Sequence, residues 1–176
     1  MQRKGLPMVI QSAPMIIKRI PDVEFWVVGE DKALNKMKGL CAQIGVLSHF
    51  RFLGWQTQDK LINQIYSNTD VFVMPSITEA LGMVFVEAMA SGIPVIGTKT
   101  GGIPEIIEDR VNGRLITYGD TQILAEAITE IITDTRIAEQ YREAGLKTVD
   151  RFTLQRMMFC TLKVYDAVLA VANQPS

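Results

Sequence analysis

The most informative stretch for chemistry runs from position 74 to position 102 and reads as a strand, a loop, a helix and a second strand. The helix begins at or near Gly82. Because a helix N-terminus offers unpaired N–H groups and a partial positive charge, it is a ready site for an anion. We expect a phosphate group to bind the backbone of Gly82, Met83 and Val84. A glycine at the first of these positions has no side chain to keep phosphate oxygens away.

Two carboxylates bracket this expected anion site, Glu79 in the loop and Glu87 on the helix. Eight helical residues span about 12 Å, so the two groups can reach opposite ends of an extended diphosphate ligand. Each carboxylate can accept two hydroxyl hydrogen bonds, which suits a ribose diol at one end and a sugar at the other. The alternative is that Glu87 is a solvated helix residue and that Glu79 only supports the helix N-terminus.

The elements that must position these residues follow an α/β pattern. Short runs of β-branched and aromatic residues alternate with longer runs at helical spacing, which predicts a doubly wound, Rossmann-like parallel sheet with helices on both faces. The strands are short and apolar, so we expect each to be buried on both faces. The predicted strands are 23–28, 50–53, 71–74, 94–97 and 114–116.

Both ends of the chain carry helical patterns. The chain opens on a helical stripe with no strand before it, although an α/β unit normally enters its first helix from a strand, so a first strand is expected to be missing. At the other end, Thr153 can cap a helix over 153–172. Its apolar stripe includes Leu162, Tyr165 and Leu169, which we expect to pack on a partner domain or to drive self-association.

The composition limits the function classes. The 176 residues fit one domain, 1–176, with 48% apolar residues, 21% charged residues and a formal net charge of -1. This balance gives no broad attraction to nucleic acid, and no apolar run approaches the roughly 20 residues of a membrane span. Cys41 and Cys160 show no metal spacing, so both are interpreted as buried thiols in a reducing, cytoplasmic compartment, with no disulfide and no structural metal.

The pattern Glu79-x7-Glu87 within PSITEALGMVFVEAMASGIPVI resembles the E-x7-E motif of the retaining GT-B glycosyltransferases of family 4, the glycosyltransferases group 1. Four further segments are similar to that family in the same order: PDVEFWVVGED, FRFLGW, GGIPEII and NGRLITYGD. The resemblance extends from Lys4 to about Tyr165. It implies the C-terminal, donor-binding half of a GT-B fold.

The resemblance also implies roles for individual residues. Glu87 would hold the ribose hydroxyls, Glu79 would contact the donor sugar, and the helix start at Gly82 would bind the diphosphate. Lys4 resembles the lysine that neutralises the departing diphosphate, whose growing negative charge a fixed cation stabilises. For Lys4, the alternative is an exposed terminal lysine.

Gly54 and Trp55 would border the nucleotide base, mainly through backbone contacts, and Trp55 could equally be a partly buried packing residue. The sequence has no DxD metal motif, which fits the metal independence usual in the family. His49, the only histidine, has no nucleophile or carboxylate partner suggested by spacing and is interpreted as an ordinary loop residue.

The sequence also departs from the family pattern. Arg3 adjoins Lys4 where the family spaces an arginine from the lysine, so that arginine cannot be assigned. Ala80-Leu81 follows Glu79 where the family more often has Gly-Phe, a change that concerns the sugar pocket. The N-terminal acceptor-binding domain, which supplies the other half of the active site in this fold, is absent.

The resulting hypothesis is the donor domain of a retaining glycosyltransferase. In the full-length enzyme, a sugar would pass from a UDP-, GDP- or ADP-sugar to an acceptor hydroxyl, and that enzyme would be peripheral to the inner membrane face. The domain alone would be inactive. Alternatives are a non-catalytic nucleotide-binding module and a GT-B-fold epimerase or phosphorylase. A dinucleotide-dependent oxidoreductase is disfavoured because GxGxxG and the following acid are absent.

Overall fold

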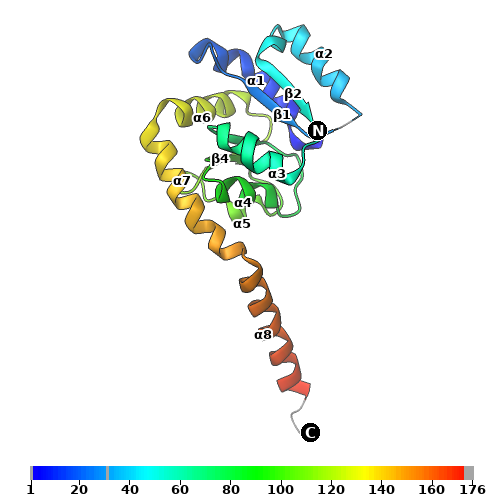
Figure 1. The fold of residues 1–176 in the computed structure, drawn as a ribbon, viewed down its shortest axis with the longest axis vertical. Coiled ribbons are helices and arrows are strands. Elements are labelled where there is room, and N and C mark those ends of the chain that lie inside the picture. Colours follow the sequence, from blue (N-terminus) through cyan, green and yellow to red (C-terminus); the bar gives the residue numbers. More distant parts are fainter. Residues whose placement is uncertain (1, 31, 173–176) are drawn as a thin grey trace.

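The computed structural model describes residues 2–30 and 32–172, and shows an α/β body from which one long helix projects (Figure 1). The five predicted strands form where runs of β-branched and aromatic residues favour extended backbone. Their boundaries differ from the predicted ones by at most two residues, and those of the last strand agree. The strands are β1 (Phe25–Val28), β2 (Phe50–Gly54), β3 (Phe72–Met74), β4 (Val95–Thr98) and β5 (Arg114–Ile116).

Helices connect the strands and cover their faces. Most begin or end at residues that favour a helix terminus: Asp120 and Asp134 accept N-cap hydrogen bonds, and Gly45 ends its helix in the left-handed region. The longer helices are α1 (Leu6–Arg19), α2 (Leu34–Ile44), α4 (Met83–Ala90), α6 (Thr121–Thr133), α7 (Thr135–Val149) and α8 (Leu154–Ala172). The shorter ones are η1 (Gln2–Lys4), η2 (Leu47–His49), α3 (Gln58–Lys60), η3 (Leu61–Ile65), η4 (Tyr66–Asn68), α5 (Ile103–Ile106) and η5 (Asp150–Phe152).

All strand pairs among the described residues are parallel, but the strands form two sheets. The first sheet pairs β1 with β2, and the second has the order β3, β4, β5. The fold class predicted from the sequence is confirmed. The division into two sheets was not predicted.

Two apolar clusters form the core. Helices α1 and α6 pack together through fully buried residues such as Ala13 and Ile128, on the side of the molecule that includes the first sheet. The second cluster surrounds Phe85 of α4, which is fully buried and makes an edge-to-face contact with Phe72 of β3. Phe85 therefore fixes α4 against the strand that precedes it.

The expectation that every strand is buried on both faces is wrong for β1 and also for β2, in which Arg51 is exposed. Trp26 and Val28 are each 37% exposed, whereas all four residues of β4 are buried. The physical reason is the division of the sheet: β4 has a strand on each side, while β1 is paired only with β2 among the described residues.

Helix α7 was missed at the sequence level. It packs across α4, and Gly145 lies so close to Met89 that an added Cβ would come within 3.2 Å of the Met89 Cγ. Only Tyr141 and Gly145 of this helix are buried, so its apolar stripe is narrow among many charged residues.

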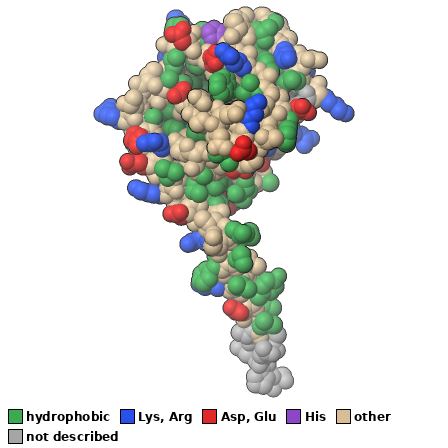
Figure 2. Space-filling view, viewed as in Figure 1, with side chains coloured by type: hydrophobic (Ala, Val, Ile, Leu, Met, Phe, Trp, Pro, Cys, Tyr) green, Lys and Arg blue, Asp and Glu red, His purple; other side chains and the backbone are tan. Residues whose placement is uncertain are grey.

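The predicted C-terminal helix is confirmed as α8, and the hydroxyl of Thr153 accepts a hydrogen bond from the N–H of Arg156 at 3.3 Å. Leu162, Tyr165 and Leu169 are 58 to 62% exposed, and apolar side chains cover much of the projecting helix (Figure 2).

Cys160 is exposed on α8, which corrects the expectation that both cysteines are buried; both are free thiols. None of the described helices combines the length and apolar composition needed to cross a membrane.

Candidate functional site

The start of α4 has the geometry expected of an anion site. Gly82 is the N-cap residue with a φ of +91°, and no side chain caps the helix there. The Phe85 N–H donates to the Gly82 carbonyl, which leaves the first-turn N–H groups of Met83 and Val84 directed out of the helix end. A Cβ at Gly82 would come within 2.9 Å of the Phe85 ring. Glycine is therefore required both by its backbone conformation and by its packing.

Glu79 lies beside this helix end, in the loop after β3. One carboxylate oxygen, Oε1, accepts a hydrogen bond from the Ala80 N–H at 3.2 Å, and the other, Oε2, accepts from the Lys4 Nζ at 2.5 Å. The Glu79 side chain is 12% exposed, against 50% for Lys4. The structure thus brings together two residues 75 positions apart that the resemblance assigned to the same site.

The loop that carries Glu79 is held by the loop after β4. The Thr100 hydroxyl donates to the Ile77 carbonyl at 3.0 Å, and the Gly102 N–H donates to the Ala80 carbonyl at 3.0 Å. A Cβ at Gly101 would come within 1.6 Å of the Glu79 carbonyl oxygen. Sequence reasoning gave no role to these three residues. The Gly101-Gly102 pair was the signal that could have revealed the close approach of two loops.

The segment around Lys4 is fixed to the same loop. The Ile77 N–H donates to the Arg3 carbonyl at 2.9 Å, and Gly5, with a φ of +80°, lies against Pro75. A Cβ at Gly5 would come within 1.9 Å of the Pro75 carbonyl oxygen. The backbone on both sides of Lys4 is therefore held, while its side chain is half exposed, so the alternative of an exposed lysine stays open.

Glu87 lies one helical turn into α4 and is half-buried. Together with Lys4 and Val84 it lines a cavity of about 720 Å³. Tyr66 lines the same cavity. Burial raises the pKa of Tyr66 to about 12, and the nearby charge of Glu87 adds to the rise. The phenol is therefore a neutral hydrogen-bond donor near pH 7.

Gly54 and Trp55 lie after β2, at the carboxyl end of the first sheet. Gly54 has a φ of +68°, and its carbonyl accepts a hydrogen bond from the Gly29 N–H at 2.7 Å. Trp55 is 67% exposed, so the alternative that it is a partly buried packing residue is wrong. Neither residue lines the cavity next to Glu87.

Two further possibilities raised by the sequence are a catalytic histidine and a metal site. The His49 Nδ1 lies 2.9 Å from the Val23 carbonyl oxygen, which confirms an ordinary loop histidine. In the part of the chain that the structure describes, no three His, Cys, Asp or Glu side chains are grouped as metal ligands.

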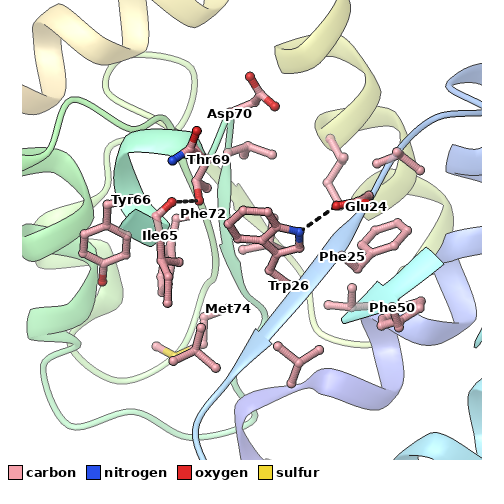
Figure 3. Close-up of a pocket in the computed structure, with 18 of the residues that line it drawn as sticks. Glu24, Phe25, Trp26, Phe50, Ile65, Tyr66, Thr69, Asp70, Phe72 and Met74 are labelled. Carbon is pink, nitrogen blue, oxygen red and sulfur yellow. Dashed lines mark hydrogen bonds between the residues drawn. The ribbon is translucent and has the colours of Figure 1, made fainter. Parts of the chain in front are cut away.

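Figure 3 shows the cavity itself, between β1 and β3. The indole of Trp26 projects into it from β1, with its N–H donating to Glu24 at 3.0 Å, and Tyr66 and Ile65 lie on the opposite side. The cavity walls are mostly apolar, and the charged residues among them include Lys4, Glu24, Asp70 and Glu87.

Comparison with known proteins identifies the class to which this fold and site belong. The family model of the glycosyl transferases group 1 matches residues 1–148. The chain belongs to this family of GT-B glycosyltransferases, and its fold is that of their C-terminal domain.

Particular relatives agree with this assignment. The lipopolysaccharide core biosynthesis glycosyltransferase LpsE of Rhizobium meliloti is 32% identical over 148 residues, which cover 84% of this chain and 42% of the relative. The crystallised C-terminal domain of the group 1 glycosyltransferase LpcC of Francisella tularensis has a TM-score of 0.77 at 29% identity, covering 88% of this chain and 82% of that one.

The structure of HepE from Anabaena in complex with UDP-glucose has a TM-score of 0.80 at 26% identity, covering 97% of this chain and 46% of that one. The chain thus spans less than half the length of the full-length relatives it matches.

Proposed function

We propose that this chain is the donor-binding domain of a retaining glycosyltransferase that uses a nucleoside-diphosphate sugar. The observation that carries the proposal is the meeting of Lys4 and Glu79 beside the open N-terminus of α4, with Glu87 one turn further along the same helix. A cation, a helix end and two carboxylates are the groups that a diphosphate flanked by two sugars requires.

The diphosphate would lie against the backbone N–H groups of Gly82, Met83 and Val84, where the helix end and the Lys4 ammonium both favour negative charge. During transfer, the bond from the anomeric carbon to the diphosphate oxygen breaks and its electron pair stays with the diphosphate. Lys4 stabilises that charge. The acceptor hydroxyl passes its proton to the departing diphosphate oxygen and bonds to the anomeric carbon on the face from which the diphosphate leaves.

The two carboxylates would bind the two ends of the donor. Glu87 would accept hydrogen bonds from the ribose hydroxyls, and Glu79 would contact the donor sugar once Lys4 turns from it to the diphosphate. Gly54 and Trp55 would border the base. HepE is described in complex with UDP-glucose, which supports a donor of the same chemical class. We propose that binding needs no metal ion, with Lys4 and the helix end in its place.

We expect binding without turnover from this chain alone, because the acceptor has to be held opposite the donor by residues beyond those of this domain. The full-length relatives are more than twice as long as the matched region, which supports this expectation. The cytoplasmic location predicted from the sequence stays a prediction.

The test is calorimetric titration of the chain with UDP, GDP and ADP in the presence of EDTA, repeated with Glu87→Ala and with Glu143→Ala. Glu143 is an exposed helical glutamate on α7 that does not line the cavity beside Glu87, and it serves as the matched control. We expect one nucleotide to bind, Glu87→Ala to weaken it about tenfold, and Glu143→Ala to leave it unchanged. No binding of any nucleotide, or equal effects of both substitutions, would contradict the proposal.

We also propose that α8 is a contact surface. Its apolar side chains are exposed along the described helix, and Leu162 and Tyr165 lie one turn apart on one face. Light scattering over a range of concentrations should show association that Leu162→Lys with Tyr165→Lys removes. A monomer at high concentration would count against self-association and leave a partner domain as the contact.

A further inference from the structure

Two polar side chains that line the cavity beside α4, Tyr66 and Glu87, have groups without a hydrogen-bond partner. Across residues 2–30 and 32–172, nothing is hydrogen-bonded to the Glu87 carboxylate or to the Tyr66 hydroxyl. Tyr66 is only 6% exposed. Within the same ranges, the Ser76 hydroxyl is the one fully buried side-chain group without a partner, so the unbonded Tyr66 hydroxyl keeps some access to solvent. Because the hydroxyl of a buried tyrosine usually has a partner, a ligand is expected to supply it.

The direction of Tyr66 is set by an irregular helix. In η3 the Tyr66 N–H is bonded to the Leu61 carbonyl, five residues earlier, which is the spacing of a π-helix. A π turn holds more residues than an α turn, so it changes the direction of the side chains that follow, and such turns are frequent at functional sites. Beyond it, the Thr69 N–H donates to the Tyr66 carbonyl at 3.1 Å, and the Thr69 hydroxyl donates to the Ile65 carbonyl at 2.7 Å. The backbone is therefore held on both sides of Tyr66.

A chain of aromatic contacts fixes the Tyr66 ring relative to α4. Tyr66 meets Phe72 edge-to-face with the ring centroids 6.4 Å apart, and Phe72 meets Phe85 in the same way at 5.5 Å. Phe85 is fully buried and lies two residues before Glu87 on α4. The phenol and the helix that carries the carboxylate therefore belong to one packed unit. Groups held in this way lose little freedom when a ligand binds between them.

The phenol points to the end of the sheet at which the proposed donor site lies. In Figure 3 the Tyr66 oxygen is directed the same way as β3, which runs from the side of Asp70 to Met74. The loop of Glu79 and the start of α4 follow that end of β3. Burial, with a smaller contribution from the charge of Glu87, raises the pKa of Tyr66 to about 12, so its hydroxyl is protonated near pH 7 and can donate.

A sugar hydroxyl matches this pair of groups. A hydroxyl both donates and accepts hydrogen bonds, whereas an ionised carboxylate only accepts and a protonated phenol can donate. One ribose hydroxyl placed between them can therefore donate to Glu87 and accept from Tyr66. A phosphate oxygen in the same place would be repelled by the carboxylate.

We propose that Tyr66 is a second ribose-binding residue, which donates a hydrogen bond to the ribose hydroxyl whose proton Glu87 accepts. The inference rests on the proposed function and adds to it a ribose contact from outside α4 and its preceding loop. The site then recognises ribose through two residues. A deoxyribose without this hydroxyl leaves both groups unpaired and binds more weakly.

The test is calorimetric titration with UDP, GDP and ADP, and with the 2′-deoxy and 3′-deoxy form of each, for the parent, Tyr66→Phe and Tyr141→Phe. Tyr141 is the matched control, because it is 3% exposed, belongs to the other apolar cluster and does not line the cavity. We expect Tyr66→Phe to weaken binding of the ribonucleotide about fivefold. The deoxy form that lacks the shared hydroxyl should bind Tyr66→Phe and the parent equally. Tyr141→Phe should change neither affinity.

The ratio of ribonucleotide to deoxynucleotide affinity separates a binding role from a structural one. A variant that is merely destabilised binds every ligand more weakly by the same factor, so this ratio stays unchanged. The same ratio in Tyr66→Phe and in the parent would overturn the proposal. If Glu87→Ala still weakened binding, the donor-binding function would stand without it. A parent that binds none of the nucleotides would overturn both.

A double-mutant cycle tests whether the two residues share one hydroxyl. Because Glu87→Ala removes the group that anchors this hydroxyl, adding Tyr66→Phe to it should weaken ribonucleotide binding by a smaller factor than in the parent. Full additivity of the two substitutions would contradict the shared hydroxyl.

Discussion

The two sheets of this protein differ in how firmly they hold their parts of the site. In the three-stranded sheet, β4 is buried along its whole length, and the loops after β3 and β4 are bonded to one another around Glu79. In the two-stranded sheet, β1 is exposed at alternate residues and Trp55 projects into solvent. The contrast indicates that the part of the site proposed for the diphosphate is preformed, whereas the part proposed for the base lies on a sheet of only two strands among the described residues.

The largest effect on stability is expected from Gly101→Ala, which disturbs the contact between the loops after β3 and β4. The added Cβ would overlap the Glu79 carbonyl oxygen, and the φ of +52° also disfavours alanine. We expect a loss of about 3 kcal/mol or more in the free energy of unfolding, measured by urea denaturation. Gly119→Ala is the control: its φ is +96° but no atom lies within 4 Å, so it should cost only about 1 kcal/mol. Similar losses for the two would mean that the loop contact is not tight.

The second-largest effect on stability is expected from alkaline pH, which deprotonates one buried group in each of the two apolar clusters. Burial raises the pKa of Tyr66, beside the three-stranded sheet, to about 12, and the pKa of Cys41, in the α1 and α2 cluster, to about 11. Their ordinary values are 10.0 and 9.0. Because the fold favours both neutral forms, the stabilisation is complete below the ordinary values and is lost as pH rises through the raised ones.

Each group should therefore account for up to about 3 kcal/mol of the alkaline loss in the free energy of unfolding. Tyr66→Phe should remove the part between pH 10 and 12, and Cys41→Ala the part between pH 9 and 11. The measurement is the urea midpoint as a function of pH for each variant and for the parent. Parallel curves for parent and variant would show that the group is not buried as described.

A smaller effect is expected from Lys4→Gln, which tests whether Lys4 binds the diphosphate of the ligand. We expect the affinity for a nucleoside diphosphate to fall about tenfold, with much less change for the monophosphate. Lys18→Gln, an exposed lysine near the far end of α1, is the control for loss of charge. Equal weakening of diphosphate and monophosphate would place Lys4 elsewhere on the ligand.

The smallest effect on stability is expected from Trp55→Ala. Since the side chain is 67% exposed, the unfolding free energy should stay within about 0.5 kcal/mol of the parent, while nucleotide affinity falls several-fold if the indole borders the base. Trp26→Ala should cost more stability, since its indole is less exposed. Nucleotide affinity unchanged by Trp55→Ala would remove this residue from the site.

The comparison also explains how far sequence reasoning could go. The strands and the start of α4 were predicted well because β-branched runs and the glycine at Gly82 act locally. The exposure of Trp26 could not be predicted, since an apolar strand does not reveal how many neighbours it has. The Glu79 and Lys4 contact joins distant positions, and only the family resemblance suggested it. The loop contact at Gly101 depends on the approach of two backbones, and the Gly101-Gly102 pair, its one sign in the sequence, does not say which backbone comes close.

Helix α8 has one further consequence. It has 19 residues, and its side chains through Leu169 are exposed, so little besides its own backbone bonds holds it in shape. In proteins, most of the stability of a helix comes from tertiary packing of its apolar face. The segment should therefore follow a helix–coil equilibrium of its own, melting gradually at temperatures where the body is still folded. Whatever surface covers it in the cell would then set its helicity.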